Sequence, residues 1–433
     1  MPPRLRFWQI ALVGALLGGG LGSTAADAAS TVLPPVTWAQ ARPATDPGPV
    51  ANAGSAYDAA TRQLVVFGGW NGAGFLRATW VWSGTSWRKA SVSGPSAQAN
   101  VSLAYDAATH QLVAFGGDSY SGGVYDFSSE TWLWNGQSWT EAATTGPPAR
   151  CCASMAYDEA THQLLLQDGY LSSDSDADDT WIWTGTTWKH LLPSTEPPAA
   201  ADTSMAYDPM SGELLFFGGF SKTAGTLDQT WAWDGHDWRG LATPTAPPAL
   251  EGASLVADPA LGGLLLFGGF DPNTYPAEAS GSTWLWGGRA WRQLEPASSP
   301  PGRGFASTAY FSLRRQLVVF GGMASQTNDD GAGTVLSDTW TMSSPPIGLE
   351  VTVLPRPRAG RAYSFVLRAK GGTGPYVFRR IAGKMAPGLH LTGNGEISGI
   401  PAHDGTYIFT VSIEDVSEFY GTANVTIDVL RRA

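Results

Sequence analysis

Cysteine is almost absent from this sequence. Its 433 residues include two cysteines, Cys151 and Cys152, and they are adjacent. Adjacent cysteines cannot tie distant parts of a chain together, so a disulfide framework is excluded and stability must come from a hydrophobic core. A vicinal disulfide, a redox pair and two packed thiols are the alternatives for this pair. The strain of a bridge between neighbours favours packed thiols.

Positive charge is also scarce. Lysine and arginine total 26 against 37 acidic residues, the net charge is −11, and no basic run is present. Proteins bind a phosphate backbone through clustered lysine and arginine, so nucleic acid is not an expected partner. A charged fraction of 15% and a hydrophobic fraction of 43% are typical of a globular chain.

Long apolar runs are missing after the N-terminus. There, Arg4 and Arg6 precede an apolar run over residues 7–21, and Ala26-Asp27-Ala28 matches a small-x-small cleavage site. The run is short of the ~20 residues needed to cross a bilayer, which disfavours a membrane anchor. We therefore predict a signal peptide over residues 1–28. The mature protein is expected to be extracellular, secreted or at the cell surface, with no integral membrane segment.

An internal repeat of about 50 residues recurs through most of the sequence. Each copy has a turn, in most copies Tyr-Asp, then a hydrophobic strand that ends in two glycines and a Thr-Trp strand, which reads Thr-Trp-x-Trp in five copies. In those five copies a turn then leads to a further tryptophan. The second residues of the glycine pairs are Gly69, Gly117, Gly219, Gly269 and Gly322, with Asp168-Gly169 as the degenerate copy. Aromatic residues at alternating positions indicate strands, so each copy predicts four antiparallel strands.

The combined pattern resembles the kelch repeat. Six copies imply an all-β fold whose main body, residues 29–347, is a six-bladed kelch-type β-propeller. The repeat tryptophans are expected to fill the wedges between blades and not to act in catalysis. Trp-x-Trp stands where many kelch repeats carry Tyr-Asp, which weakens the transfer of any particular kelch function.

The sixth copy is incomplete. After Trp340 it runs into Ser-Ser-Pro-Pro without an outer-strand tryptophan, whereas residues 35–38 near the N-terminus end in Trp38 at the expected spacing before the first copy. We predict that this N-terminal segment completes the sixth blade. Such closure removes an exposed sheet edge.

The tryptophan repeat stops before residue 348, where a different pattern begins. Gly395-Glu-Ile-Ser-Gly399-Ile-Pro401 is followed by Gly405-Thr-Tyr407 and by the alternation of Phe409, Val411 and Ile413. Alternation predicts half-buried strands. The segment resembles the Putative Ig, cadherin-like family of bacterial surface proteins. That resemblance implies an Ig-like β-sandwich over residues 348–433 that serves as a spacer or adhesion module.

Two sets of residues on the variable-loop face of the propeller are candidate ligand contacts. Aromatic side chains after the glycine pairs could stack on sugar rings or peptide side chains, with loop packing as the alternative. They are Trp70, Tyr120, Tyr170, Phe220 and Phe270. The second set opens the innermost strands and is expected to ring the channel mouth. Its ligand candidates are Asn52, Asn100 and Asp202, with Cys152, Gly252 and Phe305 at the equivalent positions and channel water as the alternative.

An acidic loop is the one candidate metal site. Asp174, Asp176 and Asp178 alternate, as oxygen ligands do at the start of a calcium loop. No glutamate follows at the calcium-loop spacing, which favours a solvated acidic loop. No cofactor is required by this interpretation, and calcium is the only ion predicted.

These features predict a binding or adhesion protein that recognises an extracellular glycan or protein, and not an enzyme. The alternative is an extracellular enzyme of carbohydrate metabolism. A sialidase-like glycoside hydrolase would need an arginine cluster on the inner strands, near which only Arg150 and Arg303 lie. A copper site like that of galactose oxidase would need two histidines beside two tyrosines, whereas His110 and His162 fall in turns of the opposite face.

Overall fold

The computed structural model describes residues 36–432 except 91, 143–144, 260, 262, 272–276, 327–332, 344–346, 372–373 and 415–419. The predicted signal peptide, residues 1–28, lies outside these residues. Strands dominate the described part of the chain, whose single helical segment is the short 3-10 turn η1 (Ser312–Arg314). Among these residues no helix has the length and apolar character to cross a membrane.

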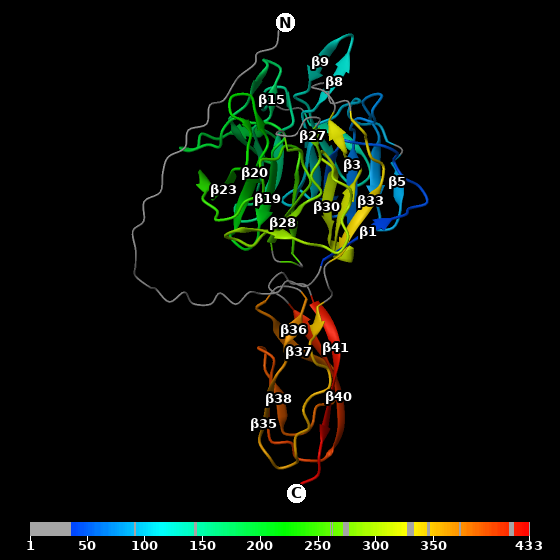
Figure 1. Ribbon diagram of the computed structural model, residues 1–433, viewed down its shortest axis with the longest axis vertical. Helices are drawn as coiled ribbons and strands as arrows, with labels where there is room; N and C mark the ends of the chain where they lie inside the picture. Colours follow the sequence, from blue (N-terminus) through cyan, green and yellow to red (C-terminus); the bar gives the residue numbers. More distant parts are fainter. Residues whose placement is uncertain are drawn as a thin grey trace, which may run out of the picture. The chain divides into compact units, whose positions relative to one another are not determined.

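Six four-stranded antiparallel sheets form the main body, as the repeat predicts (Figure 1). The strands of each blade run from the channel outward. Blade one has β2 (Gly54–Asp58), β3 (Gln63–Phe67), β4 (Thr79–Trp82) and β5 (Trp87–Lys89). Blade two has β6 (Ser102–Asp106), β7 (Gln111–Phe115), β10 (Thr131–Trp134) and β11 (Trp139–Ala142). Blade three has β13 (Ser154–Asp158), β14 (Gln163–Gln167), β17 (Thr180–Trp183) and β18 (Trp188–His190).

The next two blades repeat this order. Blade four has β19 (Ser204–Asp208), β20 (Glu213–Phe217), β23 (Thr230–Trp233) and β24 (Trp238–Leu241). Blade five has β25 (Ser254–Asp258), β26 (Gly263–Phe267), β28 (Thr283–Trp286) and β29 (Trp291–Leu294). The inner strands of successive blades contact one another around a full circle, β2 to β6, β13, β19, β25, β30 and back to β2. The six sheets therefore form a closed β-propeller.

The sixth blade is completed from the N-terminus. It contains β30 (Ser307–Phe311), β31 (Gln316–Phe320) and β33 (Thr339–Ser343), and its outer strand is β1 (Thr37–Ala41). Trp38 of β1 pairs with Met342 of β33 in antiparallel register. The predicted closure of the ring by the Trp38 segment is confirmed, because the pairing joins the two ends of the propeller and covers the edge of β33.

The glycine pairs lie where the end of an inner hairpin approaches the segment that crosses into the next blade. A methyl group on Gly116 would lie 2.4 Å from the carbonyl oxygen of Arg150, and Gly116 has a φ of +69°. Only glycine combines that close approach with that backbone conformation at low cost. The pairs therefore fix the distance between the end of an inner hairpin and the crossing into the next blade.

The outer-strand tryptophans tie neighbouring blades together. In five blades the indole N–H donates to the threonine that opens the Thr-Trp strand of the preceding blade, over 2.8 to 3.0 Å. The pairs are Trp87 with Thr339, Trp139 with Thr79, Trp188 with Thr131, Trp238 with Thr180 and Trp291 with Thr230. The sixth pair would be Trp38 with Thr283. Both are buried, yet the Trp38 Nε1 and Thr283 Oγ1 atoms have no hydrogen-bond partner within the described structure.

Short hairpins extend the loops of one end of the propeller, where the labels of β8, β9, β15 and β27 gather in Figure 1. They are β8 (Asp118–Ser121) with β9 (Val124–Phe127), β15 (Tyr170–Leu171) with β16 (Ser175–Asp176), and β21 (Phe220–Ser221) with β22 (Gly225–Thr226). In addition, β12 (Arg150–Cys151) pairs with β15, and β27 (Ala277–Glu278) of the blade-five loop pairs with β32 (Ser325–Gln326) of the blade-six loop. These hairpins follow the glycine pairs, so the loop-rich face is where the sequence predicts it.

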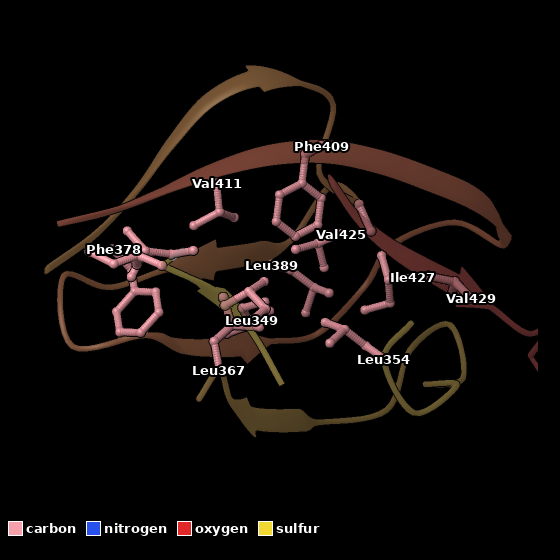
Figure 2. Packing of buried hydrophobic residues seen from close by; sticks show 14 of the residues in the cluster. Leu349, Leu354, Leu367, Phe378, Leu389, Phe409, Val411, Val425, Ile427 and Val429 are labelled. Atoms are coloured by element: carbon pink, nitrogen blue, oxygen red, sulfur yellow. The ribbon is translucent and has the colours of Figure 1, made fainter. Parts of the chain in front are cut away.

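The C-terminal segment forms a separate β-sandwich core. Its strands are β34 (Gly348–Leu349), β35 (Tyr363–Val366), β36 (Ala369–Lys370), β37 (Val377–Gly383), β38 (Leu389–Leu391), β39 (Glu396–Gly399), β40 (Gly405–Glu414) and β41 (Tyr420–Val429). The alternate residues Phe409, Val411 and Ile413 of β40 are at most 1% exposed. They pack with Val425 and other buried residues into one apolar cluster (Figure 2). The predicted Ig-like sandwich is confirmed.

Candidate ligand site at the channel mouth

The residues that open the inner strands form a closed ring of backbone hydrogen bonds. Each N–H donates to the carbonyl of the equivalent residue in the preceding blade, over 2.7 to 3.1 Å. The members are Asn52, Asn100, Cys152, Asp202, Gly252 and Phe305, and all have a φ between 53° and 63°. This left-handed conformation turns the backbone at the same place in every blade. The ring fixes six side-chain positions around the channel mouth, as the repeat alignment predicts.

A polar cavity lies inside this ring. At the mouth its volume is about 160 Å³, and its lining includes all six ring residues. A second cavity of about 200 Å³ shares Ala53, Ala153 and Thr203 with the first and continues along the inner strands. Hydroxyl groups of Ser102, Ser154 and other inner-strand residues line this deeper part. The channel therefore offers a ligand a concave entrance and many hydrogen-bonding groups.

One carboxyl group, that of Asp202, lines the mouth, and those of Asp118 and Glu251 lie close enough to act on its charge. Burial, together with the nearby charge of Glu251, raises the pKa of Asp202 from 3.8 to about 7. Burial likewise raises the pKa of Asp118 to about 6 and raises the pKa of Glu251. None of the three takes part in an ion pair within the described residues. The charges of Asp118 and Glu251 repel a charge on Asp202, and no basic side chain among the described residues forms an ion pair with any of the three.

Two amides next to Asp118 form a directed relay. The Asn100 side-chain N–H donates to Asp118 over 2.8 Å, and the Asn52 side-chain N–H donates to the Asn100 oxygen over 2.6 Å. An ionised carboxylate can only accept, so Asp118 sets the orientation of both amides. The Asn52 side-chain oxygen is left as an acceptor at the mouth, because it receives no hydrogen bond from the described residues.

An aromatic wall forms another part of the mouth. The Phe305 ring lies across Gly252, where a side chain would meet the ring carbons at 2.5 to 2.7 Å. Phe270 packs against Phe305 with ring centroids 5.6 Å apart and is 0% exposed. The prediction that Phe270 offers a stacking platform is therefore wrong, because neighbouring residues of blade six cover it. Trp70 is half-buried and packs in the same small cluster.

The other predicted platforms lie on the outer rim. Tyr120 is 51% exposed and pairs with Tyr125 across the β8–β9 hairpin, with ring centroids 4.9 Å apart. Phe220 is 39% exposed. Tyr170 is half-buried, with the ammonium of Lys222 4.8 Å from its ring centroid. None of these rim residues lines the two channel cavities.

The predicted calcium loop already holds a cation of the protein itself. Lys222 forms an ion pair with Asp174, and its backbone N–H donates to Asp176 over 2.7 Å. Asp178 is exposed. Within the part of the chain that the structure describes, no three acidic, histidine or cysteine side chains are grouped as metal ligands. Calcium binding here stays a prediction, and a calcium ion would have to compete with Lys222.

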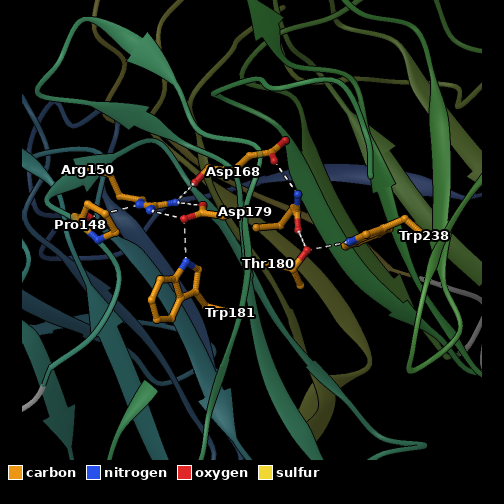
Figure 3. A network of polar contacts seen from close by, with 8 residues as sticks. Pro148, Arg150, Asp168, Asp179, Thr180, Trp181 and Trp238 are labelled. Atoms are coloured by element: carbon orange, nitrogen blue, oxygen red, sulfur yellow. Dashed lines mark hydrogen bonds and ion pairs between the residues drawn. The ribbon is translucent and has the colours of Figure 1, made fainter. Parts of the chain in front are cut away.

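Two buried arginines near the mouth clamp loops and do not face the channel. Arg150 forms a bidentate ion pair with Asp179 and donates to the Asp168 carbonyl over 2.9 Å (Figure 3). Asp179 also accepts from Trp181 over 2.7 Å. Arg303 makes the equivalent bonds to Asp338 in blade six. Burial alone would raise the pKa of Asp179, but Arg150 lowers it. Neither arginine lines the cavities, so neither can hold an anionic ligand there.

The adjacent cysteines are both free thiols at the mouth. Cys151 is buried and Cys152 lines the cavity. The Cys152 S–H donates to Cys151, and this hydrogen bond, together with burial, raises the pKa of the Cys152 thiol well above its usual value. Against the larger effect of burial, hydrogen bonding by the same thiol lowers the pKa of Asp202. A protonated thiol is a poor nucleophile, which supports a packing role.

Asp118 and Glu251 were not among the residues predicted for the site. Glu251 occupies the position before its ring residue, where the other blades have Ala51, Ala99, Cys151, Ala201 and Gly304. It is the only charged residue in that set, and this was a readable signal. Asp118 follows a glycine pair, a position at which we considered only aromatic residues as ligand contacts.

The fold and the site define a class of protein: a six-bladed β-propeller with a polar channel mouth, joined to an Ig-like domain. Residues 345–430 match the family described as Putative Ig domain. Among solved structures, 183 chains match the fold. One, titled "Structure of YjhT", has a TM-score of 0.53 and 14% identity, and the match covers 71% of this chain and 97% of that one. This likeness shows the fold alone, and no curated protein matches the sequence.

Proposed function

We propose that this protein is an extracellular recognition module that binds a carbohydrate at the channel mouth of its propeller. The predicted signal peptide supports export, and the Ig-like domain suits a spacer or adhesion role. We retain residues 29–347 and 348–433 as the bounds of the propeller and the Ig-like domain. The kelch relationship stays a prediction from the repeat.

The six ring positions carry this proposal. Their backbones are equivalent, held by the same hydrogen bond in every blade, yet their side chains comprise two amides, a thiol, a carboxyl, a hydrogen and a phenyl ring. A ring that only closed a channel would need no such variety. Amides, a carboxyl and hydroxyls around one cavity, with an aromatic wall beside them, suit a ligand with many hydroxyl groups and one apolar face.

Glycoside hydrolysis is the second candidate, and one observation favours it. The pKa of Asp202 is raised to about 7, so its carboxyl keeps a proton near neutral pH, as a general acid must. Glu251 is a second carboxyl near it. A sialidase-like reaction has less support, because Arg150 and Arg303 are both committed to buried ion pairs.

A glycan array tests the proposal. Wild type is compared with Asn52→Gly/Asp202→Gly, which copies the natural Gly252 and so suits the left-handed backbone, and with the rim variant Tyr120→Ser/Phe220→Ser. We expect wild type and the rim variant to bind the same glycans and the mouth variant to lose them. Binding by the mouth variant, or loss in the rim variant alone, would refute the choice of site. Release of shortened glycan by wild type would favour the hydrolase.

A further inference from the structure

We propose that the ligand of the channel mouth carries a protonated amine, and specifically that it is an amino sugar. This inference rests on the proposed function and names the class of carbohydrate. It stands on the lining of the cavity, whose described residues include no lysine, arginine or histidine.

Three acids of this face have basic partners. Asp179 is paired with Arg150, Asp338 with Arg303 and Asp174 with Lys222. Asp118, Asp202 and Glu251 have no ion-pair partner among the described residues, although they are more enclosed than Asp174. Enclosing several carboxyl groups without a cation is unfavourable, because the groups lose water and repel one another. A cation that enters the mouth would relieve both effects.

The hydrogen-bonding groups of the mouth also favour a cation. Ionised Asp118 orients the amide relay so that it ends in the Asn52 side-chain oxygen. An ammonium group has three donors and no acceptor, so it matches an entrance of amide and carboxyl oxygens. A sugar carboxylate would meet repulsion there. The geometry thus selects a donor-rich, positively charged group and excludes acidic sugars.

The remainder of the lining favours a sugar over a lysine side chain. The channel below the mouth carries serine and threonine hydroxyls, which suit a polyol. The Phe305 ring beside Gly252 offers one apolar face, against which the carbon face of a sugar ring can pack. The four methylene groups of lysine would instead need an apolar tunnel.

Calorimetric titration with two oligosaccharides of equal length, one of glucosamine and one of N-acetylglucosamine, tests this inference. At a pH at which the amine is protonated, wild type should bind the free amine about 10- to 100-fold more tightly, as expected for a charge-assisted hydrogen bond. Asp202→Asn keeps the shape of the side chain and suits the left-handed backbone of the ring. It should reduce the preference to near unity. The matched control Asp174→Asn, on the rim, should leave the preference unchanged.

Each other outcome overturns the inference in a distinguishable way. Equal binding of both oligosaccharides by wild type would refute the amine preference and leave the proposed function intact. Binding of other glycans on the array, but of neither oligosaccharide, would do the same. If wild type bound no glycan at all, both the amine preference and the proposed function would be overturned. A preference that Asp174→Asn abolishes, or tighter binding of a lysine-bearing peptide than of the amino sugar, would show that the amine site or its ligand is wrongly assigned.

Discussion

Replacing tryptophan by phenylalanine in the outer strands should lower the free energy of unfolding by an amount that depends on the blade. Trp139 donates to Thr79 over 2.8 Å, and both residues are buried. Trp139→Phe removes this bond and leaves the Thr79 hydroxyl without it, at a cost of about 1–3 kcal/mol beyond the lost packing. Trp38 has the equivalent position, but its buried N–H has no partner among the described residues. Trp38→Phe should therefore cost about 1–3 kcal/mol less than Trp139→Phe.

Chemical denaturation of the full chain, followed by near-ultraviolet circular dichroism, measures both variants. A double-mutant cycle of Trp139→Phe with Thr79→Val isolates the bond and should give a coupling of about 0.5–1.5 kcal/mol. Equal destabilisation by Trp38→Phe and Trp139→Phe, with a coupling near zero, would refute the view that these bonds join the blades.

Three further predictions concern the charged groups. The pKa of Asp202 is raised from 3.8 to about 7, so the folded protein binds more protons than the unfolded chain between those values and loses stability as pH rises through them. Thermal melts should show that Asp202→Asn gains about 1–2 kcal/mol relative to wild type above pH 7 and little near pH 4, because water in the mouth screens part of the nominal ~4 kcal/mol. A constant difference at all pH values would contradict this. Arg150→Met leaves the Asp179 carboxylate unpaired and should cost about 3–5 kcal/mol in denaturation, of which adding Asp179→Asn should recover a part. Without recovery, the charge is not the cause. Lys222→Gln frees Asp174, so calcium should raise the melting temperature of that variant more than that of wild type. An equal rise in both would show that Lys222 does not compete with calcium.

The architecture was readable from the sequence because the repeat encodes it at every level. The glycine pairs, the Thr-Trp strands and the outer tryptophans each have a position in a blade, and Trp38 lies at the spacing that completes the sixth. The channel ring was also predictable, since residues at equivalent places in equivalent blades occupy equivalent places in space. Asn52, Asn100 and Asp202 line the mouth as expected.

The remaining errors concern contacts between residues far apart in the sequence. Phe270 is buried by Phe305 and Met323 of the next blade, and a repeat alignment carries no information about that packing. The roles of Arg150 and Arg303 depend on bonds to aspartates about thirty residues later. A signal for these was present, since only blades three and six combine an arginine two positions before the ring with an aspartate before Thr-Trp.

Recognition at the channel mouth can be tested by a crystal structure of wild type grown with a glucosamine oligosaccharide. We expect a sugar ring against Phe305 with its amine within hydrogen-bonding distance of Asp202 or the Asn52 side-chain oxygen. A sugar bound instead at the Tyr120–Tyr125 hairpin, with the mouth holding only water, would contradict it.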